Sequence, residues 1–346
     1  MKLVHGGDTV GYRERYGHDA LDFSANVSPL GVPEAVARAI GEAAFQADQY
    51  PDPLCRALTA ALSQTEAVPK AWILCGNGAA DLIFRLALAE KPKHALVLAP
   101  TFAEYAAALE TVDCEIHRHM LREENDFALT DDVLNAIEPP IDRVFLCQPN
   151  NPTGQAADRT LMRRILAKCE AVGARLAVDE CFLDFLPDGE AWTMKPELAA
   201  HPGLFILKAF TKLYGMAGVR LGYGLCADED LLARMRRAGQ PWAVSSLAQT
   251  AGLAALGQTK YVAQVRTLIE TERPYLLEGL RALGLRVIEG RLFRADETLG
   301  ERLEKLGVVV RRCGNYPGLD DSWYRTAVRT RRENDALLAA LREAMA

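Results

Sequence analysis

Four short groups of residues carry side chains that could bind a ligand or react with one, and each follows a short apolar run. The first is residues 76–81 (GNGAAD), which begin a helical pattern after the run WILC. Glycines let a ligand approach the backbone closely, and the free N–H groups of a helix N-terminus favour an anion such as phosphate. An ordinary turn between a strand and a helix explains this group equally well.

The second and third groups offer an amide and a carboxylate. Residues 148–154 (QPNNPTG) form a rigid loop, in which Asn150 and Asn151 either cap the backbone or present an amide to a ligand. Asp179 and Glu180 come directly after an apolar run, where a buried carboxylate requires a cationic partner. That partner is either a lysine or arginine of the chain or the protonated ring nitrogen of a pyridine cofactor.

The fourth group contains a lysine that could act as an amine nucleophile. Thr211 and Lys212 lie between the run LFIL and a glycine-containing turn, and Arg220 follows eight residues after Lys212. Burial would lower the pKa of this lysine and leave its amine reactive, whereas a lone loop lysine is usually solvated. The four groups are therefore informative mainly through their order along the chain, because each has a simple structural explanation by itself.

The elements that must position these groups alternate between strand-sized apolar runs and helical patterns. The runs are residues 95–99, 143–147, 175–178, 204–207 and 221–225, and the helical patterns include 81–90, 159–172 and 228–237. This alternation predicts an α/β fold with a largely parallel sheet between two layers of helices. Ligands of such sheets bind at the carboxyl ends of the strands, which is where the polar groups lie.

The pattern changes after residue 258 and predicts a second, smaller domain. A long helix is expected at 259–283, strands at 286–288, 308–310 and 323–329, and a last helix at 332–344. We therefore predict a large domain at 46–257 and a small α+β domain at 258–346. Residues 1–45 are rich in turn residues and are expected to form an N-terminal arm that also contributes to the small domain.

The composition excludes several kinds of partner. The net charge of -6 comes from 40 Lys and Arg against 46 Asp and Glu, so the chain lacks the basic excess typical of nucleic-acid binding. Residues 1–8 contain no apolar signal segment, and no apolar run has membrane-spanning length. The eight cysteines include no C-x-x-C pair, which is typical of free thiols in a reducing compartment. We expect a cytoplasmic protein with no nucleic-acid, membrane or metal partner.

The order of the four groups resembles the class I and II aminotransferases, which are pyridoxal-phosphate (PLP) enzymes of fold type I, and the resemblance covers nearly the whole chain. It implies that Lys212 binds PLP as a Schiff base and moves protons at the substrate carbon. It implies that Asp179 keeps the pyridine nitrogen protonated and that Asn151 donates to the phenolate oxygen of the ring. The remaining implied cofactor contacts are Gly78, Ala79, Ala80, Thr211 and Arg220 around the phosphate, and Phe102, or as second choice Tyr105, against the ring.

Two further positions follow from the same resemblance. Tyr50 resembles the tyrosine that reaches the cofactor phosphate of the neighbouring subunit, which implies a homodimer with shared active sites. Phe182 stands where the family often has a tyrosine, so the phenolate oxygen has one donor fewer. The stretch between Gly290 and Arg311 is shorter than in the family, so the small domain is expected to be reduced.

The substrate is indicated by arginines near the C-terminus. By resemblance, Arg325 in the stretch WYRTAVR grips the substrate carboxylate as a bidentate fork, while His5, Arg311 and Arg329 bind a phosphate. The N-terminal His-Gly-Gly and the segment DFSANVSPLG resemble the threonine-phosphate decarboxylases of cobalamin biosynthesis. The expected reaction is decarboxylation of L-threonine O-3-phosphate to (R)-1-amino-2-propanol phosphate. The alternatives are a histidinol-phosphate or related aminotransferase and a PLP-fold protein that binds without catalysis.

Overall fold

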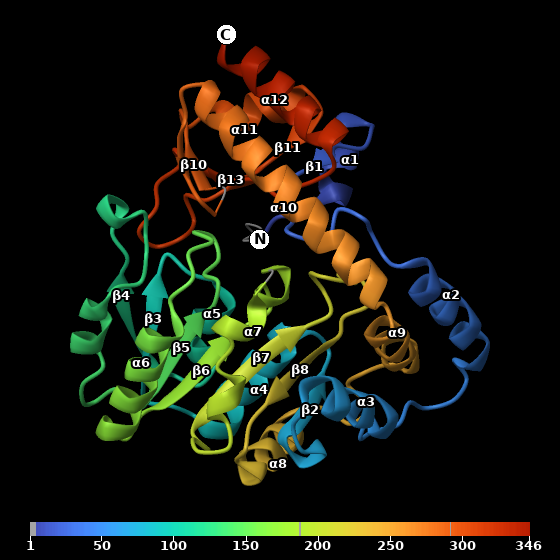
Figure 1. The fold of residues 1–346 in the computed structure, drawn as a ribbon, viewed down its shortest axis with the longest axis vertical. Coiled ribbons are helices and arrows are strands. Elements are labelled where there is room, and N and C mark those ends of the chain that lie inside the picture. The colour runs from blue at the N-terminus through green and yellow to red at the C-terminus, as the bar shows by residue number, and fades with distance from the viewer. Residues whose placement is uncertain (1–4, 187, 291) are drawn as a thin grey trace.

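The structure, a computed structural model, describes residues 5–186, 188–290 and 292–346 (Figure 1). A lower body contains the main sheet between helices, and an upper lobe contains the C-terminal helices and a smaller sheet, as Figure 1 shows. The long helix α10 (Thr259–Ala282) runs from the body into this lobe. The predicted α/β architecture is therefore confirmed.

The main sheet has seven strands in the order β2-β8-β7-β6-β5-β3-β4. Their bounds are β2 Ile73–Gly76, β3 His94–Ala99, β4 Glu115–Met120, β5 Arg143–Cys147, β6 Arg175–Asp179, β7 Leu204–Ala209 and β8 Gly222–Leu225. The strands from β7 to β4 are mutually parallel, and β8 runs antiparallel to both of its neighbours. The carboxyl ends of β5, β6 and β7 therefore lie along one edge of the sheet.

Helices cover both faces of this sheet, which is why its inner strands are apolar throughout. Side chains alternate along each strand, so Val144 and Leu146 of β5 join one core while Phe145 and Cys147 join the other. The first core includes side chains of α3 (Arg56–Glu66), α6 (Arg159–Val172) and α9 (Ser246–Leu256). The second includes side chains of α4 (Ala79–Glu90), α5 (Glu104–Glu110) and α8 (Glu229–Ala238).

The edge strand β4 was not predicted from the sequence. Its residues EIHRHM are polar or half-exposed, so they lack the apolar run that identified the inner strands. An edge strand pairs on one side only and can carry polar side chains. The other strands absent from the prediction are the short β1 (Leu21–Asp22), β10 (Leu292–Arg294) and β12 (Arg311–Arg312).

The upper lobe is built on a four-stranded antiparallel sheet in the order β12-β13-β10-β9. Here β9 is Arg286–Ile288 and β13 is Trp323–Arg325, and the lobe also contains α11 (Leu299–Lys305) and α12 (Arg331–Met345). The expectation of one strand over 323–329 was too long. Beyond Arg325 the chain leaves the sheet, because the Ala327 N–H donates to the carbonyl of Phe23 in the N-terminal arm.

The N-terminal arm contacts both parts of the molecule. Its strand β1 pairs with β11 (Val308–Val309) of the upper lobe, whereas α2 (Glu34–Ala43) packs on α9 of the body. The predicted domain boundary at 257/258 falls between α9 and α10, and it stays a prediction. Two short helices complete the fold, α1 (Thr9–Tyr16) and α7 (Gly189–Trp192).

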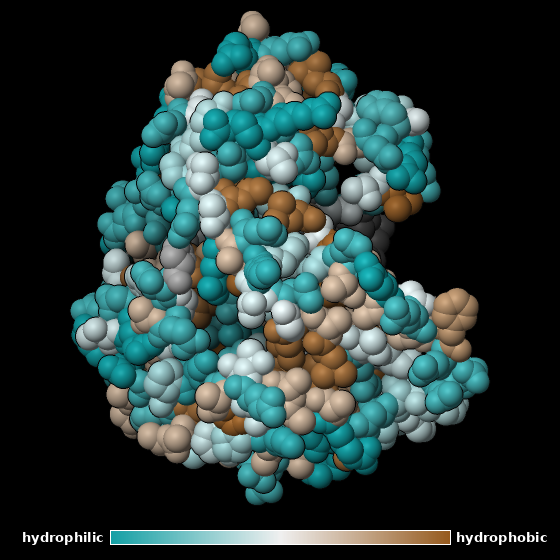
Figure 2. Space-filling view, turned by 45° about the vertical axis from the view of Figure 1, so that its right-hand side comes forward, coloured by the Kyte–Doolittle hydropathy of each residue, from teal (hydrophilic) through white to brown (hydrophobic). Residues whose placement is uncertain are grey.

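The face shown in Figure 2 is largely polar with scattered apolar patches, and it has a notch on its right-hand side between the upper and lower parts of the molecule. Between the loops of the body and helix α10 lies a cavity of about 590 Å³, whose lining includes Asn26, Asn151 and Phe182. Within the described ranges, no helix combines the length and the apolar character needed to cross a bilayer.

Candidate active site

Asp179 is the last residue of β6 and lies beside the end of β5, where Cys147 is its partner in register. Its carboxylate is 7 % exposed and accepts hydrogen bonds from the Tyr105 hydroxyl (2.7 Å) and the Cys181 N–H (2.9 Å). Burial and the negative charge of Asp179 raise the pKa of Tyr105, so this hydroxyl stays a donor. The carboxylate is therefore held in one orientation by two neutral donors.

Lys212 lies in the loop after β7, and it is half-buried. Burial lowers the pKa of Lys212, and the guanidinium groups of Arg325 and Arg220 act in the same direction. Its Nζ is 5.4 Å from the centroid of the Phe182 ring, which therefore stands beside the amine. The Lys212 carbonyl accepts the Ser28 N–H (2.8 Å), so the N-terminal arm holds this loop in place. An amine with a lowered pKa is a nucleophile at neutral pH.

A site for an anion lies at the N-terminus of α4, a helix of 12 residues. Gly78 precedes it with φ +85°, and a Cβ at Gly78 would lie 2.6 Å from the Arg220 Nη2 atom. A Cβ at Gly222 would lie 2.7 Å from the Ala79 backbone nitrogen. Only glycines fit at these two positions. Because they have no side chains, the Arg220 guanidinium can lie next to the helix N-terminus. Both features favour negative charge.

The two asparagines of the 148–154 loop have different surroundings. Asn150 is buried, accepts a hydrogen bond from Thr101 and donates to the Pro100 carbonyl, so it holds the loop together. The Asn151 Oδ1 instead accepts from the Arg325 guanidinium, whose Nη2 also donates to the Ser24 carbonyl (2.8 Å). Both asparagines line the cavity, and of the two it is Asn151 that contacts the upper lobe, through Arg325.

Arg325 and Arg311 form a pair of buried guanidinium groups. They lie directly opposite each other on β13 and β12, so both side chains project from the same face of that sheet. The Arg311 guanidinium donates to Asn315 (2.8 Å) and lies over the ring of Tyr316. The Nε of Arg325 is buried and has no hydrogen-bond partner among the described residues. Two guanidinium groups so close together favour an anionic ligand between the lobes.

The structure brings His5 close to Phe102, with their ring centroids 5.6 Å apart, and places the His5 ring 2.5 Å from the Glu104 carboxylate. The rings of Phe102 and Tyr105 also pack edge to face. Arg329, in contrast, pairs with Glu333 and donates to the Asp22 carbonyl. The substrate and ring contacts that the sequence suggested for these residues stay predictions.

Tyr50 and Thr211 complete the predicted set. The side chain of Tyr50 is 82 % exposed and stacks on Trp242, with ring centroids 4.7 Å apart. It is directed away from the chain's own interior, whereas Thr211 is buried next to Lys212. The predicted contact of Tyr50 with a neighbouring subunit would therefore be made by an exposed aromatic ring.

One residue of this site, Asn26, and the contacts of two others, Phe182 and Tyr105, were not predicted from the sequence. Asn26 lines the cavity together with Asn151, and its Oδ1 is buried without a hydrogen-bond partner among the described residues. Phe182 was noted as a departure from the family, but not as a neighbour of the Lys212 amine. Tyr105 was considered for ring stacking, whereas it donates to Asp179 and stacks on Phe145. The segment SANVSP around Asn26 was the one available signal.

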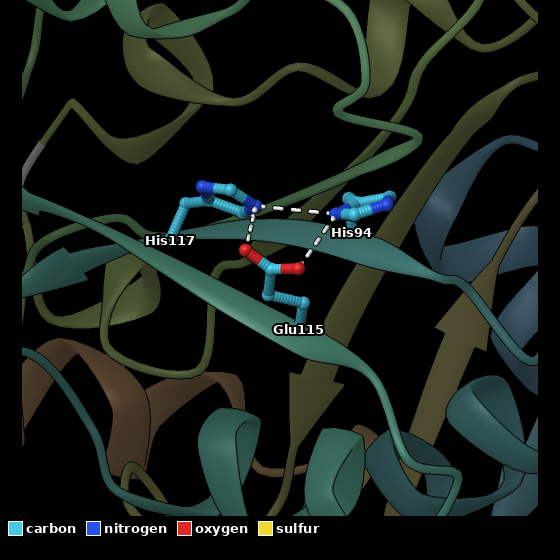
Figure 3. Close-up of side chains that lie close together, drawn as sticks. All are labelled: His94, Glu115 and His117. Atoms are coloured by element: carbon cyan, nitrogen blue, oxygen red, sulfur yellow. Dashed lines mark hydrogen bonds and ion pairs between the residues drawn. The ribbon is translucent and has the colours of Figure 1, made fainter.

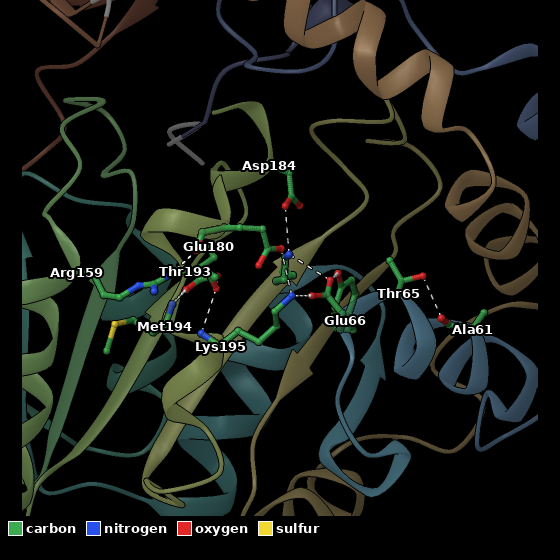
Figure 4. A network of polar contacts seen from close by, with 12 residues as sticks. Ala61, Thr65, Glu66, Arg159, Glu180, Asp184, Thr193, Met194 and Lys195 are labelled. Atoms are coloured by element: carbon green, nitrogen blue, oxygen red, sulfur yellow. Dashed lines mark hydrogen bonds and ion pairs between the residues drawn. The ribbon is translucent and has the colours of Figure 1, made fainter. Parts of the chain in front are cut away.

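Glu180, adjacent to Asp179, belongs to a separate network of buried charges (Figure 4). Its carboxylate accepts hydrogen bonds from Thr193 Oγ1 (2.6 Å) and the Met194 N–H (2.8 Å). Nearby, the Lys208 amine lies 3.1 Å from Glu66 and 3.2 Å from Asp184. This network anchors Thr193 and Met194 through Glu180, and it anchors Asp184, two residues after Phe182, through Lys208.

Comparison with known proteins identifies the family. Residues 18–341 match the model of the family "Aminotransferase class I and II". The chain belongs to this family. It is 39% identical over 333 residues to threonine-phosphate decarboxylase of Salmonella typhimurium strain LT2, covering 94% of this chain and 91% of that protein. It is 33% identical to histidinol-phosphate aminotransferase 1 of Cupriavidus pinatubonensis, covering 94% of this chain and 88% of that protein.

Solved structures agree with this assignment. The histidinol-phosphate aminotransferase of Clostridium acetobutylicum superposes with a TM-score of 0.86 at 27% identity, covering 93% of this chain and 98% of that one. The L-threonine-O-3-phosphate decarboxylase of Porphyromonas gingivalis gives 0.83 at 24% identity, with 94% and 98% covered, and so shares the fold. The predicted fold type I is thereby confirmed.

Enzymes of this family are PLP-dependent, and the described residues fit that cofactor chemically. The α4 N-terminus and Arg220 suit its phosphate, and the buried Asp179 carboxylate suits a protonated ring nitrogen. The lowered pKa of Lys212, caused by burial and by Arg325, suits an amine that must attack an aldehyde. The glycines at 78 and 222 leave room that a Cβ would fill.

Proposed function

We propose that this protein catalyses the PLP-dependent decarboxylation of L-threonine O-3-phosphate to (R)-1-amino-2-propanol phosphate, a step of cobalamin biosynthesis. The observation that supports this most directly is the buried pair Arg311 and Arg325 on adjacent strands. Threonine phosphate carries a carboxylate and a phosphate of about -1.5 to -2 charge, and such a ligand requires more than one arginine. The 39% identity to a threonine-phosphate decarboxylase supports the same substrate.

The proposed cofactor contacts are those that the family resemblance implies, and the burial of Asp179 and the lowered pKa of Lys212, caused by burial and by Arg325, support them. Lys212 binds PLP covalently, Asp179 pairs with its ring nitrogen, and Asn151 donates to its phenolate oxygen. The phosphate of PLP is held by the residues at the start of α4 together with the cationic and hydroxyl groups beside them, namely Gly78, Ala79, Ala80, Thr211 and Arg220. Phe102 packs against the ring. Bound PLP supplies an electron sink for the pair of electrons released when a bond to the substrate Cα breaks.

The residues of the chain decide which bond breaks. Arg325 fixes the substrate carboxylate, so its position sets whether the bond to CO2 or the bond to hydrogen stands perpendicular to the ring. Arg311 and His5, with Arg329, hold the substrate phosphate at the other end. After CO2 leaves, the Lys212 amine is the group placed to deliver a proton to Cα, so that one proton replaces the carboxylate. Asp179 keeps its negative charge throughout and stabilises the protonated ring nitrogen.

A histidinol-phosphate aminotransferase is the second candidate, because relatives with that activity are 33% identical to this chain. Histidinol phosphate has no carboxylate, so one guanidinium of the Arg311 and Arg325 pair would be buried without an anionic partner. Leaving a buried charge unpaired is costly, which favours a substrate that has both a carboxylate and a phosphate.

We further propose a homodimer in which Tyr50 reaches the cofactor phosphate of the other subunit. This proposal is supported by the exposed ring of Tyr50 and its stacking on the partly exposed Trp242. Light scattering of the active protein tests it, and the mass of a single chain would exclude it. The buried free thiols of the cysteines support a reducing, cytoplasmic location.

The decisive experiment offers O-phospho-L-threonine and histidinol phosphate separately to the PLP-loaded wild type and to Arg311→Ala. We expect release of CO2 and aminopropanol phosphate from the first substrate by the wild type, and a raised KM in the variant. Efficient transamination of histidinol phosphate with phosphothreonine left intact would establish the aminotransferase instead. A PLP absorbance band that responds to phosphothreonine without turnover would indicate a protein that binds without catalysis.

A further inference from the structure

A second cluster of ligand-type side chains lies at the opposite end of the main sheet from Asp179 and Lys212. His94 is the first residue of β3, and Glu115 and His117 lie at the start of the edge strand β4. Figure 3 shows the two imidazole rings and the carboxylate converging on one another from these adjacent strands. We propose that these three residues bind a divalent transition-metal ion of the Zn²⁺, Co²⁺ or Ni²⁺ class.

The pairing of the strands creates this cluster. His94 is opposite Glu115 in the parallel register, and Leu96 is opposite His117. Glu115 and His117 are two residues apart, so both side chains project from the same face of β4. The start of β3 is held in place because the Asp142 carboxylate accepts the backbone N–H groups of Lys93 (2.8 Å) and His94 (3.3 Å). The ligands therefore come from a rigid part of the sheet.

The distances between the ligand atoms match those around a tetrahedral metal ion. His94 Nδ1 is 3.3 Å from His117 Nε2, and each nitrogen is 3.5 Å from a different oxygen of Glu115. Zinc–nitrogen bonds of about 2.0–2.1 Å at tetrahedral angles place two ligand nitrogens roughly 3.3–3.4 Å apart. All three ligand atoms lie within 4.8 Å of one another, so one ion can contact all of them after small side-chain rotations.

The ligand types also select the class of ion. Two imidazoles and one carboxylate form a donor set that zinc uses when it keeps a fourth position for water. Imidazole nitrogen suits zinc, cobalt and nickel, whereas magnesium and calcium prefer sets made of oxygen only. The three side chains are partly solvent-exposed, so water has access to the fourth position. The site could not be recognised in the sequence, because Glu115 follows His94 by 21 positions.

A metal ion bound by these three residues would link β4 to its neighbour β3 at the open edge of the sheet. An ion that binds the folded state but not the unfolded chain raises the melting temperature, and the stabilisation grows with the logarithm of the ion concentration relative to its dissociation constant. The cluster is remote from the carboxyl ends of β5 and β6, so occupation of this site should leave turnover unchanged. Metal binding and the proposed decarboxylase activity can therefore fail independently of each other.

The test is calorimetric titration of the untagged, chelator-treated and desalted protein with ZnCl2. We expect one equivalent per chain for the wild type and at least about tenfold weaker binding in His94→Asn and in His117→Asn, since even changes to groups behind a ligand cost that much. The matched control is His119→Asn on the same strand, because His119 lies 3.6 Å from Asp132 and outside the cluster. This control should bind like the wild type.

A conservative variant separates loss of a ligand from damage to the strand. His117→Cys keeps a zinc-type donor, so it should restore binding that His117→Asn loses, and with CoCl2 it should add a thiolate-to-cobalt band in the near ultraviolet. Zinc should raise the melting temperature of the wild type and of His119→Asn but not of the His94→Asn/His117→Asn double variant. Equal zinc affinity in that double variant and the wild type, or no binding by the wild type at micromolar zinc, would overturn the proposal.

Discussion

Lys208 and Lys212 are four residues apart, the first buried and the second half-buried, yet their surroundings give their amines opposite properties. Burial alone would lower the pKa of Lys208, but Asp184, Glu66 and Glu180 raise it far above its ordinary value. Burial lowers the pKa of Lys212 too, and there the nearby Arg325 lowers it further. The first amine is fixed as a cation by its ion pairs with Glu66 and Asp184, while the second remains available for chemistry.

The neighbouring carboxyl groups differ in the same way. Asp179 and Glu180 each accept one hydroxyl and one backbone N–H, and both are buried. Asp179 lies at the end of its strand beside Lys212, whereas Glu180 points into the network that contains Lys208. Burial and residue type therefore do not identify the reactive lysine or the reactive carboxylate. The charged groups around each side chain identify it, and variants of these residues should separate the two roles.

The largest expected effect is on catalysis by Lys212→Ala. This variant should lose the visible absorbance band of covalently bound PLP, and its turnover should fall by roughly 10²–10⁴-fold or more, because the amine that moves the proton is gone. The matched control is Lys208→Met, which should keep the band. Wild-type-like turnover in Lys212→Ala would show that the assignment of the nucleophile is wrong.

Lys208→Met should instead affect folding. Removing Lys208 leaves Asp184 without this cation and leaves Glu66 with Lys195 alone. Breaking a buried ion pair in this way costs up to about 3–5 kcal/mol of unfolding free energy. Urea denaturation measures this loss. Adding Glu66→Gln should recover part of it, because the uncompensated charge is then removed as well. Additive losses in the double variant would contradict the ion-pair interpretation.

The sequence predicted the inner strands, the long helices and the order of the catalytic groups, because each depends on local patterns of apolar and turn residues. It could not predict contacts between distant segments. Arg311 and Arg325 lie opposite each other because of the register between two strands. The hydrogen bond from Tyr105 to Asp179 joins residues that are 74 positions apart. The network around Lys208 likewise combines residues from α3, β7 and the loop after β6. The polar edge strand β4 gave no apolar signal at all.

Glu180→Gln should change how stability depends on pH. Burial raises the pKa of Glu180 from 4.5 to about 7. The folded protein therefore binds one more proton than the unfolded chain between these values, so this group's contribution to stability is present below pH 4.5 and is lost as pH rises to about 7. The loss is at most about 3 kcal/mol. Thermal unfolding from pH 4.5 to 8 should show a flatter profile for the glutamine variant, and an unchanged slope would count against the burial of an ionisable group there.

Asp179→Asn is the counterpart in the active site. It removes a charge-assisted bond to the proposed ring nitrogen, worth about 1.5–3 kcal/mol, so turnover should fall roughly 10- to 100-fold with little change in substrate binding. Steady-state kcat and KM measure the two effects separately. A raised KM at unchanged kcat would indicate that Asp179 binds substrate and does not tune the ring.

The smallest effects should come from the neutral donors, Tyr105→Phe and Thr193→Val. Each variant removes one hydroxyl from one of the adjacent carboxylates, at a cost of about 1 kcal/mol per hydrogen bond. In Tyr105→Phe this cost should appear mainly as a roughly 5-fold lower kcat, because Asp179 loses its fixed orientation beside the cofactor. In Thr193→Val it should appear as lower unfolding free energy at unchanged kcat, because the Glu180 carboxylate anchors Thr193 and Met194 and, within the described ranges, makes no hydrogen bond to the proposed cofactor residues. If both variants lowered kcat equally, the two carboxylates would not have separate functions, and the network around Lys208 would have to be counted as part of the active site.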